Sequence, residues 1–281
     1  MKINKKNLTT ELHGVTRSFN TKILSSYVSS VVFLFLSLFC LLSCGLEAFY
    51  YIDYIPDTDV VMTDNTFARV QLPSSSAEGY SNYFTNFVIY YRVYISGEAS
   101  SGLINTSDLR RQVNSALDSD FLGMNSLTDK TSTSVSTSNL ENTFIGRKYF
   151  RLTLEEEGID SVLNSGSLGK ALTISFSPVN GVRPVLTLNE ASYTLRRAVS
   201  GPGLNFNPVP DNRYFLNHPD LYNTANVTNE KNADTASNSS TNTEIKYTYV
   251  SMYIFAIGKE YLTTIYSQPT HIGIFRLPEA F

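Results

Sequence analysis

The sequence has no tryptophan, only two cysteines and no excess of basic residues. Two cysteines among 281 residues exclude a small scaffold held together by disulfides. The 25 Asp and Glu residues outnumber the 22 Lys and Arg residues, and the net charge of −3 argues against nucleic-acid binding, which requires a clustered basic excess. The chain does have 18 tyrosines and 17 phenylalanines with few charges, a composition that favours strands over helical bundles.

The first 43 residues have the layout of an export signal. A basic region that includes Lys2, Arg17 and Lys22 precedes a nearly continuous apolar run over residues 31–42. An apolar core of about 7–15 residues after a basic flank is typical of a secretory signal, whereas a membrane-spanning helix needs about 20 residues. We therefore expect residues 1–43 to be a signal peptide that is removed from the mature protein.

The apolar run ends in Leu41-Leu42-Ser43-Cys44-Gly45, which resembles a bacterial lipobox. In lipoproteins with this motif, the cysteine thiol receives a diacylglycerol and the chain is cut directly before the cysteine. The resemblance thus implies cleavage between Ser43 and Cys44 and lipidation, as with palmitate, of Cys44. Leu42 departs from the commonest pattern, which has a small residue there, although relaxed lipoboxes of spirochaete type accept it.

The alternative is an ordinary cleaved signal or an uncleaved anchor, with Cys44 unmodified. We favour lipidation because Cys44 stands where the apolar core stops, whereas Cys40 lies inside that core and is more simply an apolar filler. Cleavage would remove five basic residues and one acidic residue, so the net charge would move from −3 to −7. Two or more acyl chains hold a protein stably on a bilayer, at about 0.8 kcal/mol per buried CH₂. The predicted partner is therefore a membrane, through lipidated Cys44.

After the signal, we expect an anchor-proximal segment over 44–59, whose residues 45–56 form a first strand. Residues 60–281 are expected to form a mainly β domain, an antiparallel β-sandwich that is immunoglobulin-like at most. Hydrophobic alternation and turn residues predict its strands. They are expected over 60–62, 66–72, 83–96, 143–154, 171–176, 185–188, 191–199, 247–257, 263–267 and 272–277, with a turn at 258–260.

Helix and loop patterns are sparse in this domain. One short helix is expected to begin at Thr106 and end at Gly123, followed by a polar loop over 128–142. The acidic run at 155–157 predicts one or two helical turns directly after it, where the helix dipole favours acids. Residues 223–244 hold one larger aliphatic side chain, Val227, so burial cannot offset their ordering entropy and we expect a mobile loop.

Two stretches of the sequence resemble lipoproteins of treponeme-type spirochaetes whose function is unassigned. One is SCGLE at 43–47 followed by FYYID at 49–53. The other is MYIFAI at 252–257 with IYS at 265–267, PT at 269–270 and IGIF at 272–275. The resemblance implies a lipid-anchored protein of the bacterial envelope and carries over no catalytic residue.

Candidates for chemistry are few. An acidic cluster comprises Asp53, Asp57, Asp59 and Asp64, but it lacks the glycine and closing glutamate of a calcium-binding EF-hand loop, so solvated acids are favoured. His218 and His271 have no metal-ligand spacing, and the G-x-S-x-G pattern of a nucleophilic serine is absent. No catalytic, cofactor-binding or metal-binding residue is therefore predicted.

Three hypotheses about function follow from the sequence. The first is an exported cell-envelope lipoprotein, on the outer membrane or the periplasmic face of the inner membrane. Its role would be binding or structural rather than catalytic, towards a protein or host ligand that the sequence does not identify. The second is an envelope hydrolase that acts on glycans through a carboxylate pair drawn from Asp53, Asp57 or Glu156. The third is a surface adhesin that uses the 223–244 loop and tyrosine-rich strands, although such tyrosines are more often half-buried in a sheet. They are Tyr90, Tyr91, Tyr94, Tyr247, Tyr249 and Tyr253.

Overall fold

The computed structural model describes residues 51–96, 140–177, 179, 181–197, 214–216, 235–236 and 247–279. The chain divides into two units, Met1–Phe49 and Tyr50–Phe281, and every described residue belongs to the second. The predicted signal peptide, its cleavage point at Ser43 and Cys44, and the helix expected from Thr106 therefore lie outside the described residues. So does the 223–244 loop, apart from Thr235–Ala236.

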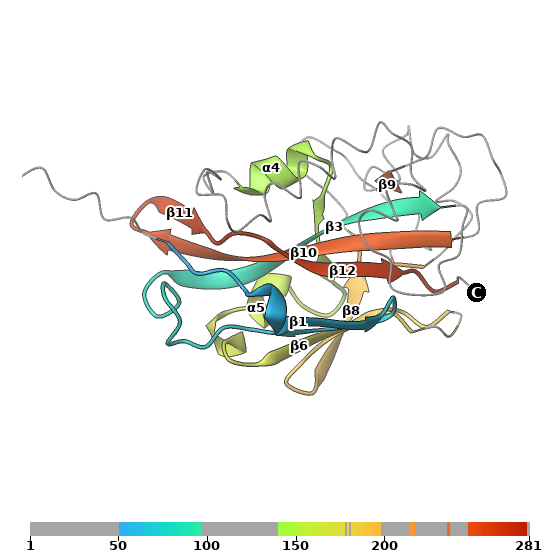
Figure 1. The fold of residues 1–281 in the computed structure, drawn as a ribbon, viewed down its shortest axis with the longest axis horizontal. Helices are drawn as coiled ribbons and strands as arrows, with labels where there is room; N and C mark the ends of the chain where they lie inside the picture. Colours follow the sequence, from blue (N-terminus) through green and yellow to red (C-terminus); the bar gives the residue numbers. More distant parts are fainter. Residues whose placement is uncertain are drawn as a thin grey trace, which may run out of the picture. The chain divides into compact units, whose positions relative to one another are not determined.

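The described residues form two sheets of almost entirely antiparallel strands, which confirms the predicted mainly β sandwich (Figure 1). The first sheet has the order β1-β2-β6-β7-β8-β5. Its strands are short, and most match the predicted segments. They are β1 (Val60–Asp64), β2 (Phe67–Gln71), β5 (Thr153–Leu154), β6 (Ala171–Ser175), β7 (Val185–Leu188) and β8 (Ala191–Arg196).

The second sheet is built on two long strands, β3 (Phe84–Ser96) and β10 (Tyr247–Glu260), which pair antiparallel along their length. On the far side of β10 lie β11 (Thr263–Tyr266) and β12 (Thr270–Arg276). On the far side of β3 lie β4 (Phe150–Arg151) and β9 (Thr235–Ala236), the latter in a parallel bridge.

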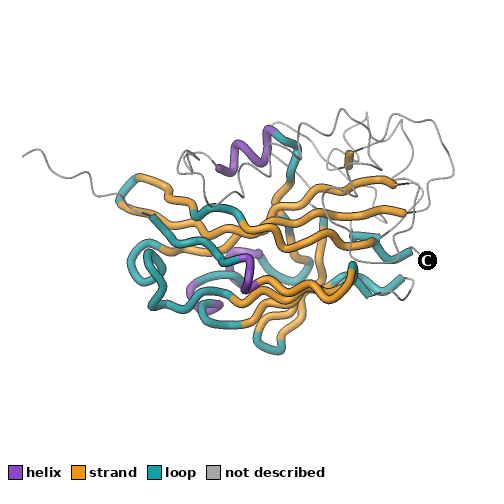
Figure 2. The backbone as a smooth tube through the Cα atoms, in the orientation of Figure 1, coloured by secondary structure: helices purple, strands orange, loops and turns teal. Residues whose placement is uncertain are grey.

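The inner faces of the two sheets pack together to form the main core. The first sheet contributes alternate residues such as Val70, Leu172 and Leu186, and the second contributes Ile89 and Ile254, all fully buried. Figure 2 shows the two layers of strands lying one over the other. The period-two patterns of β6 and β7 arise directly from this arrangement, because only one face of the first sheet reaches the core.

The prediction of a polar loop up to 142 and a strand over 143–154 is wrong in its first part. Residues Leu140–Gly146 form a helix, α4, which packs the buried side chains of Leu140 and Phe144 onto the outer face of the second sheet. These side chains lie one helical turn apart, at i and i+4, and therefore share one face of the helix. The strand begins only after Lys148, whose positive φ of 60° reverses the chain.

The strand that follows α4 links the two sheets. Phe150–Arg151 pairs with β3 in the second sheet, whereas Thr153–Leu154 pairs with β8 in the first. Between them, the Leu152 amide donates to the Ile89 carbonyl at 2.8 Å. After a short acidic run, the chain forms α5 (Ile159–Val162), at the place where one or two helical turns were predicted, and then the 3₁₀ turn η3 (Ser165–Ser167).

The expected first strand is also wrong for its described part, because residues 51–56 have no regular secondary structure before the 3₁₀ turn η1 (Asp57–Asp59). The segment instead packs irregularly against the sandwich through Ile52 and Ile55, both buried. Two glycines make room for it. A Cβ on Gly79 would lie 2.7 Å from the Cα of Ile52, and a Cβ on Gly258 would strike the Ile52 side chain.

The expected turn at 258–260 is wrong as well. β10 continues through Gly258 to Glu260, where Glu260 pairs with Thr263, and the turn is made by Tyr261 and Leu262. Gly258 is needed for close packing rather than for chain reversal, since a Cβ there would also lie 2.6 Å from the Tyr83 carbonyl oxygen.

Candidate functional site

Two carboxylates of the predicted acidic cluster, Asp53 and Asp64, accept local hydrogen bonds. Asp53 accepts from the backbone amide of Tyr54 at 2.9 Å. Asp64 accepts from both the hydroxyl and the amide of Thr66, and these bonds lower the pKa of Asp64. Asp57 and Asp59 lie in the turn η1, where Asp57 is exposed and Asp59 is half-buried. Across the described ranges, no three His, Cys, Asp or Glu side chains gather in a way that could hold a metal ion.

The acidic run at 155–157 ties the strand β5 to its neighbours. Glu155 forms an ion pair with Arg183 at 3.2 Å and accepts a hydrogen bond from the Tyr214 hydroxyl at 2.5 Å. Glu156 accepts from the amide and the hydroxyl of Thr194, both at 2.8 Å. Burial of Glu156 opposes its ionisation, but the two hydrogen bonds from Thr194 have the larger combined effect and lower the pKa of Glu156. Glu155 therefore holds Arg183 and Tyr214, and Glu156 braces β8 through Thr194.

Five tyrosines of the adhesin hypothesis are more deeply buried than predicted, and the side chain of the sixth, Tyr247, lies outside the described part of the structure. Tyr90, Tyr91, Tyr94, Tyr249 and Tyr253 all have exposed fractions of 2% or less. Tyr91 points into the main core, where its ring meets that of Phe215 edge-on at 4.7 Å. The other four lie on the opposite face of β3 and β10, where Tyr90 faces Tyr253 and Tyr94 faces Tyr249 across the strand pair. They are structural residues of the sheet and offer no exposed contact surface.

We call this outer face of the second sheet the tyrosine face, because it combines several tyrosines with charged and polar side chains. It contains Tyr90, Arg92, Tyr94, Tyr249, Ser251, Tyr253 and Phe255 from the two long strands, His271 from β12, Tyr266 from β11, Tyr149, and Glu141 and Phe144 from α4. Their aromatic rings contact one another closely. The Phe144 ring lies 5.0 Å from that of Tyr90 and 5.2 Å from that of Phe255.

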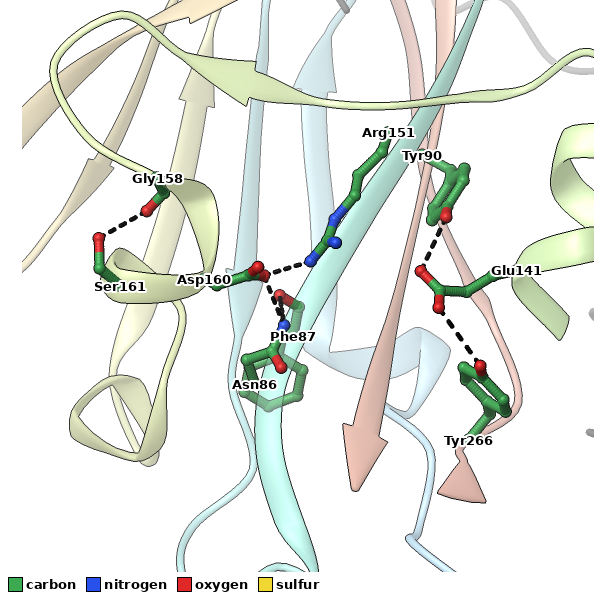
Figure 3. Close-up of polar contacts among 9 residues, drawn as sticks. All are labelled: Asn86, Phe87, Tyr90, Glu141, Arg151, Gly158, Asp160, Ser161 and Tyr266. Carbon is green, nitrogen blue, oxygen red and sulfur yellow. Dashed lines mark hydrogen bonds and ion pairs between the residues drawn. The ribbon is translucent and has the colours of Figure 1, made fainter. Parts of the chain in front are cut away.

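Glu141 joins three elements at the edge of the tyrosine face (Figure 3). One of its carboxylate oxygens accepts from the Tyr90 hydroxyl at 2.9 Å, and the other accepts from the Tyr266 hydroxyl at 3.3 Å. Burial, with the negative charge of Glu141 beside it, raises the pKa of both tyrosines. Both phenols therefore remain protonated donors at neutral pH and hold α4 to β3 and β11.

A second carboxylate, Asp160 on α5, is bound on the other side of β3 in Figure 3. It accepts from the Asn86 side-chain amide at 2.7 Å and forms an ion pair with Arg151 of β4. Glu141 and Asp160 thus each accept from two side-chain donors that lie on other elements, and each carboxylate fastens these elements to one another.

Within the tyrosine face, further polar groups pair with one another. The hydroxyls of Tyr94 and Tyr149 lie 2.9 Å apart. The buried Arg92 guanidinium donates to the Arg147 carbonyl at 3.0 Å, just after α4. His271 is bonded through Nε2 to the Ser251 hydroxyl at 3.0 Å and packs against the Tyr253 ring at 4.6 Å. Burial lowers the pKa of His271 to about 4, so this imidazole is neutral at pH 7.

Sequence reasoning did not find Glu141 or Asp160. Glu141 lay in a stretch expected to be a loop, and its partner Tyr266 is 125 residues away in the chain. No local pattern marks such a contact. His218, Ser43 and Cys44 lie outside the described residues, so their surroundings stay a matter of prediction.

Comparison of the chain with protein-family models, with curated proteins and with solved structures finds no match. The resemblance to spirochaete lipoproteins therefore stays a prediction. In the part of the chain that the structure describes, no helix has the length and apolar character needed to cross a membrane.

Proposed function

We propose that the protein is a lipid-anchored lipoprotein of the bacterial cell envelope, and that its β-sandwich has a binding or structural role rather than a catalytic one. The observation that carries the proposal is the position of Cys44, directly after an apolar core of signal-peptide length and within Leu41-Leu42-Ser43-Cys44-Gly45. A diacylglycerol on that thiol with a third acyl chain on the new amine gives stable membrane attachment.

The start of the sandwich supports this arrangement. Ile52, eight residues after Cys44, is already buried against Gly79 and Gly258. Eight residues span at most about 29 Å, so a lipid on Cys44 would hold the domain close to the bilayer surface. The resulting protein is a membrane-proximal β domain with a short tether.

The polar groups of the domain support a non-catalytic role. Glu141, Glu155, Glu156 and Asp160 each accept from two side-chain or backbone donors that lie on other elements. A catalytic acid or base needs a carboxyl group that can exchange its proton with a substrate. These four carboxylates instead fasten helices and strands to one another.

Metabolic labelling with palmitate tests the anchor, and the chain supplies its own control. We expect label in the wild-type protein and in Cys40→Ala, because Cys40 lies within the removed segment. We expect none in Cys44→Ala, which should also remain unprocessed and keep residues 1–43. Equal labelling of Cys44→Ala and wild type would refute the proposal.

A protease-accessibility experiment on intact cells distinguishes the two membranes. Cleavage of the lipidated protein by added protease would place it on the cell surface. Protection that is lost when the outer membrane is opened would place it in the periplasm, on the inner face of the outer membrane or on the inner membrane.

A further inference from the structure

The turn between β10 and β11 has the most exposed apolar side chains of the described structure. Tyr261 is 90% exposed and Leu262 is completely exposed, whereas the other exposed large hydrophobic residues range from 43% to 60%. The flanking residues Lys259, Thr263 and Thr264 are exposed as well, so the tip stands clear of the core. An aromatic and an aliphatic side chain side by side at such a tip are costly to leave in water.

The backbone of this turn is held in an uncommon conformation. Tyr261 has a φ of 51°, in the left-handed region that costs a non-glycine residue about 1 kcal/mol or more. Asparagine or glycine is the usual residue at such a position. A tyrosine there, followed by leucine, places two exposed apolar side chains at the tip of a hairpin whose last pair is Glu260 and Thr263.

The tip lies at the end of the domain where the described chain begins. In Figure 1, the start of the blue segment and the turn before β11 are at the same end of the strands. The contact between Ile52 and Gly258 confirms their proximity. The turn is about three residues beyond Gly258, or about 10 Å along the strand, and Cys44 is at most about 29 Å from Ile52. A bilayer that holds Cys44 is therefore within reach of the tip.

We propose that Tyr261 and Leu262 insert into the interface between headgroups and acyl chains of the bilayer that holds Cys44. This inference rests on the proposed lipid anchor. Tyrosine is enriched at that depth of a membrane, leucine adds apolar contact, and the exposed Lys259 ammonium reaches the anionic headgroups. The hairpin then acts as a second contact that fixes the orientation of the sandwich on the membrane.

Because the sequence has no tryptophan, a single introduced indole reports on its own position alone. The full lipidated protein is reconstituted into phosphatidylethanolamine–phosphatidylglycerol vesicles as Leu262→Trp and, separately, as Val182→Trp. Val182 is a suitable control because it is exposed and follows Gly181, whose amide donates to the Glu279 carbonyl after β12, at the opposite end of β10 from the tip. Flotation of the vesicles reports the anchor, and indole fluorescence reports the depth of each position.

We expect both proteins to float with the vesicles. The Leu262→Trp protein should emit at shorter wavelength than Val182→Trp, be quenched by brominated lipids and be several-fold less sensitive to acrylamide. Flotation with equal acrylamide sensitivity of the two proteins would overturn the hairpin contact and leave the anchor intact. Failure to float, with both indoles in water, would overturn the anchor and the hairpin contact together.

Discussion

The two sheets of the sandwich bury their strands differently. On β6 and β7 of the first sheet, buried and half-buried side chains alternate, so that one face packs inward and the other borders water. On the second sheet, every residue over 86–94 of β3 and over 248–258 of β10 is buried. The second sheet is therefore a central layer with both faces covered, although its long strands are antiparallel.

The two covered faces of the second sheet differ in chemistry. Aliphatic residues such as Val93 and Val250 dominate the inner face, which packs on the first sheet. The outer tyrosine face also holds Arg92, Ser251 and His271, each with a hydrogen-bond partner. Buried polar groups are costly unless they are paired, so the hydrogen bonds of the outer face fix the position of the covering helix α4. The inner face mainly stabilises the fold by burying apolar side chains.

Truncation of the outer face gives the largest expected effect. Phe255→Ala removes a fully buried ring from the tyrosine face and should lower the free energy of unfolding by about 3–5 kcal/mol. Val185→Ala, on the water-bordering face of β7, should cost about 1 kcal/mol or less. Chemical denaturation of the purified proteins measures both values. Similar losses for the two variants would mean that the outer face is not a second core.

A pH titration tests His271, the half-buried histidine of the tyrosine face. Burial lowers the pKa of His271 to about 4 in the folded protein, below the 6.5 of an exposed histidine, so the unfolded chain binds more protons as the pH falls below about 6.5. Folding stability should therefore decrease with falling pH, by about 2 kcal/mol between pH 6.5 and pH 5 from this group alone.

The matched variant for this titration is His271→Gln, which keeps a side chain able to bond to Ser251 but does not titrate. Its unfolding free energy should lose less between pH 6.5 and pH 5 than that of the wild type, measured by denaturation at each pH. Parallel pH profiles for the two proteins would show that folding does not lower the pKa of His271.

The different burial of the two sheets also explains which parts of the fold were predictable. The strands of the first sheet were found because alternating apolar residues mark a sheet face. On β10 and β3 the run of apolar residues is nearly continuous, and such a run does not indicate which side chains face a second layer. The covering helix α4 was missed for a related reason, since Phe144 was assigned to the period-two pattern of the strand that follows.

Glycine and long-range contacts account for the other errors. Gly258 was expected to end β10, but it serves close packing against Ile52 and Tyr83, which the sequence near it does not reveal. The bonds of Glu141 connect α4 with β3 and β11 across 51 and 125 residues. A contact of that kind depends on the sheet order, and the sheet order follows from packing rather than from local propensity.

The smallest expected effect concerns the polar attachment of the covering layer. Glu141→Gln keeps the size of the side chain but replaces two charge-assisted bonds from Tyr90 and Tyr266 with weaker neutral ones, so it should lower the free energy of unfolding by about 1 kcal/mol. The control is Glu157→Gln, an exposed acid whose hydrogen bond from Ser161 is long, at 3.4 Å, and which should change stability little. Chemical denaturation measures the free energy of unfolding of both variants.

Hydrogen exchange should also rise in α4 of Glu141→Gln and not in the first sheet, because only the outer layer depends on this carboxylate. An equal effect of the two substitutions would mean that the covering layer is held by burial alone, as the inner face is.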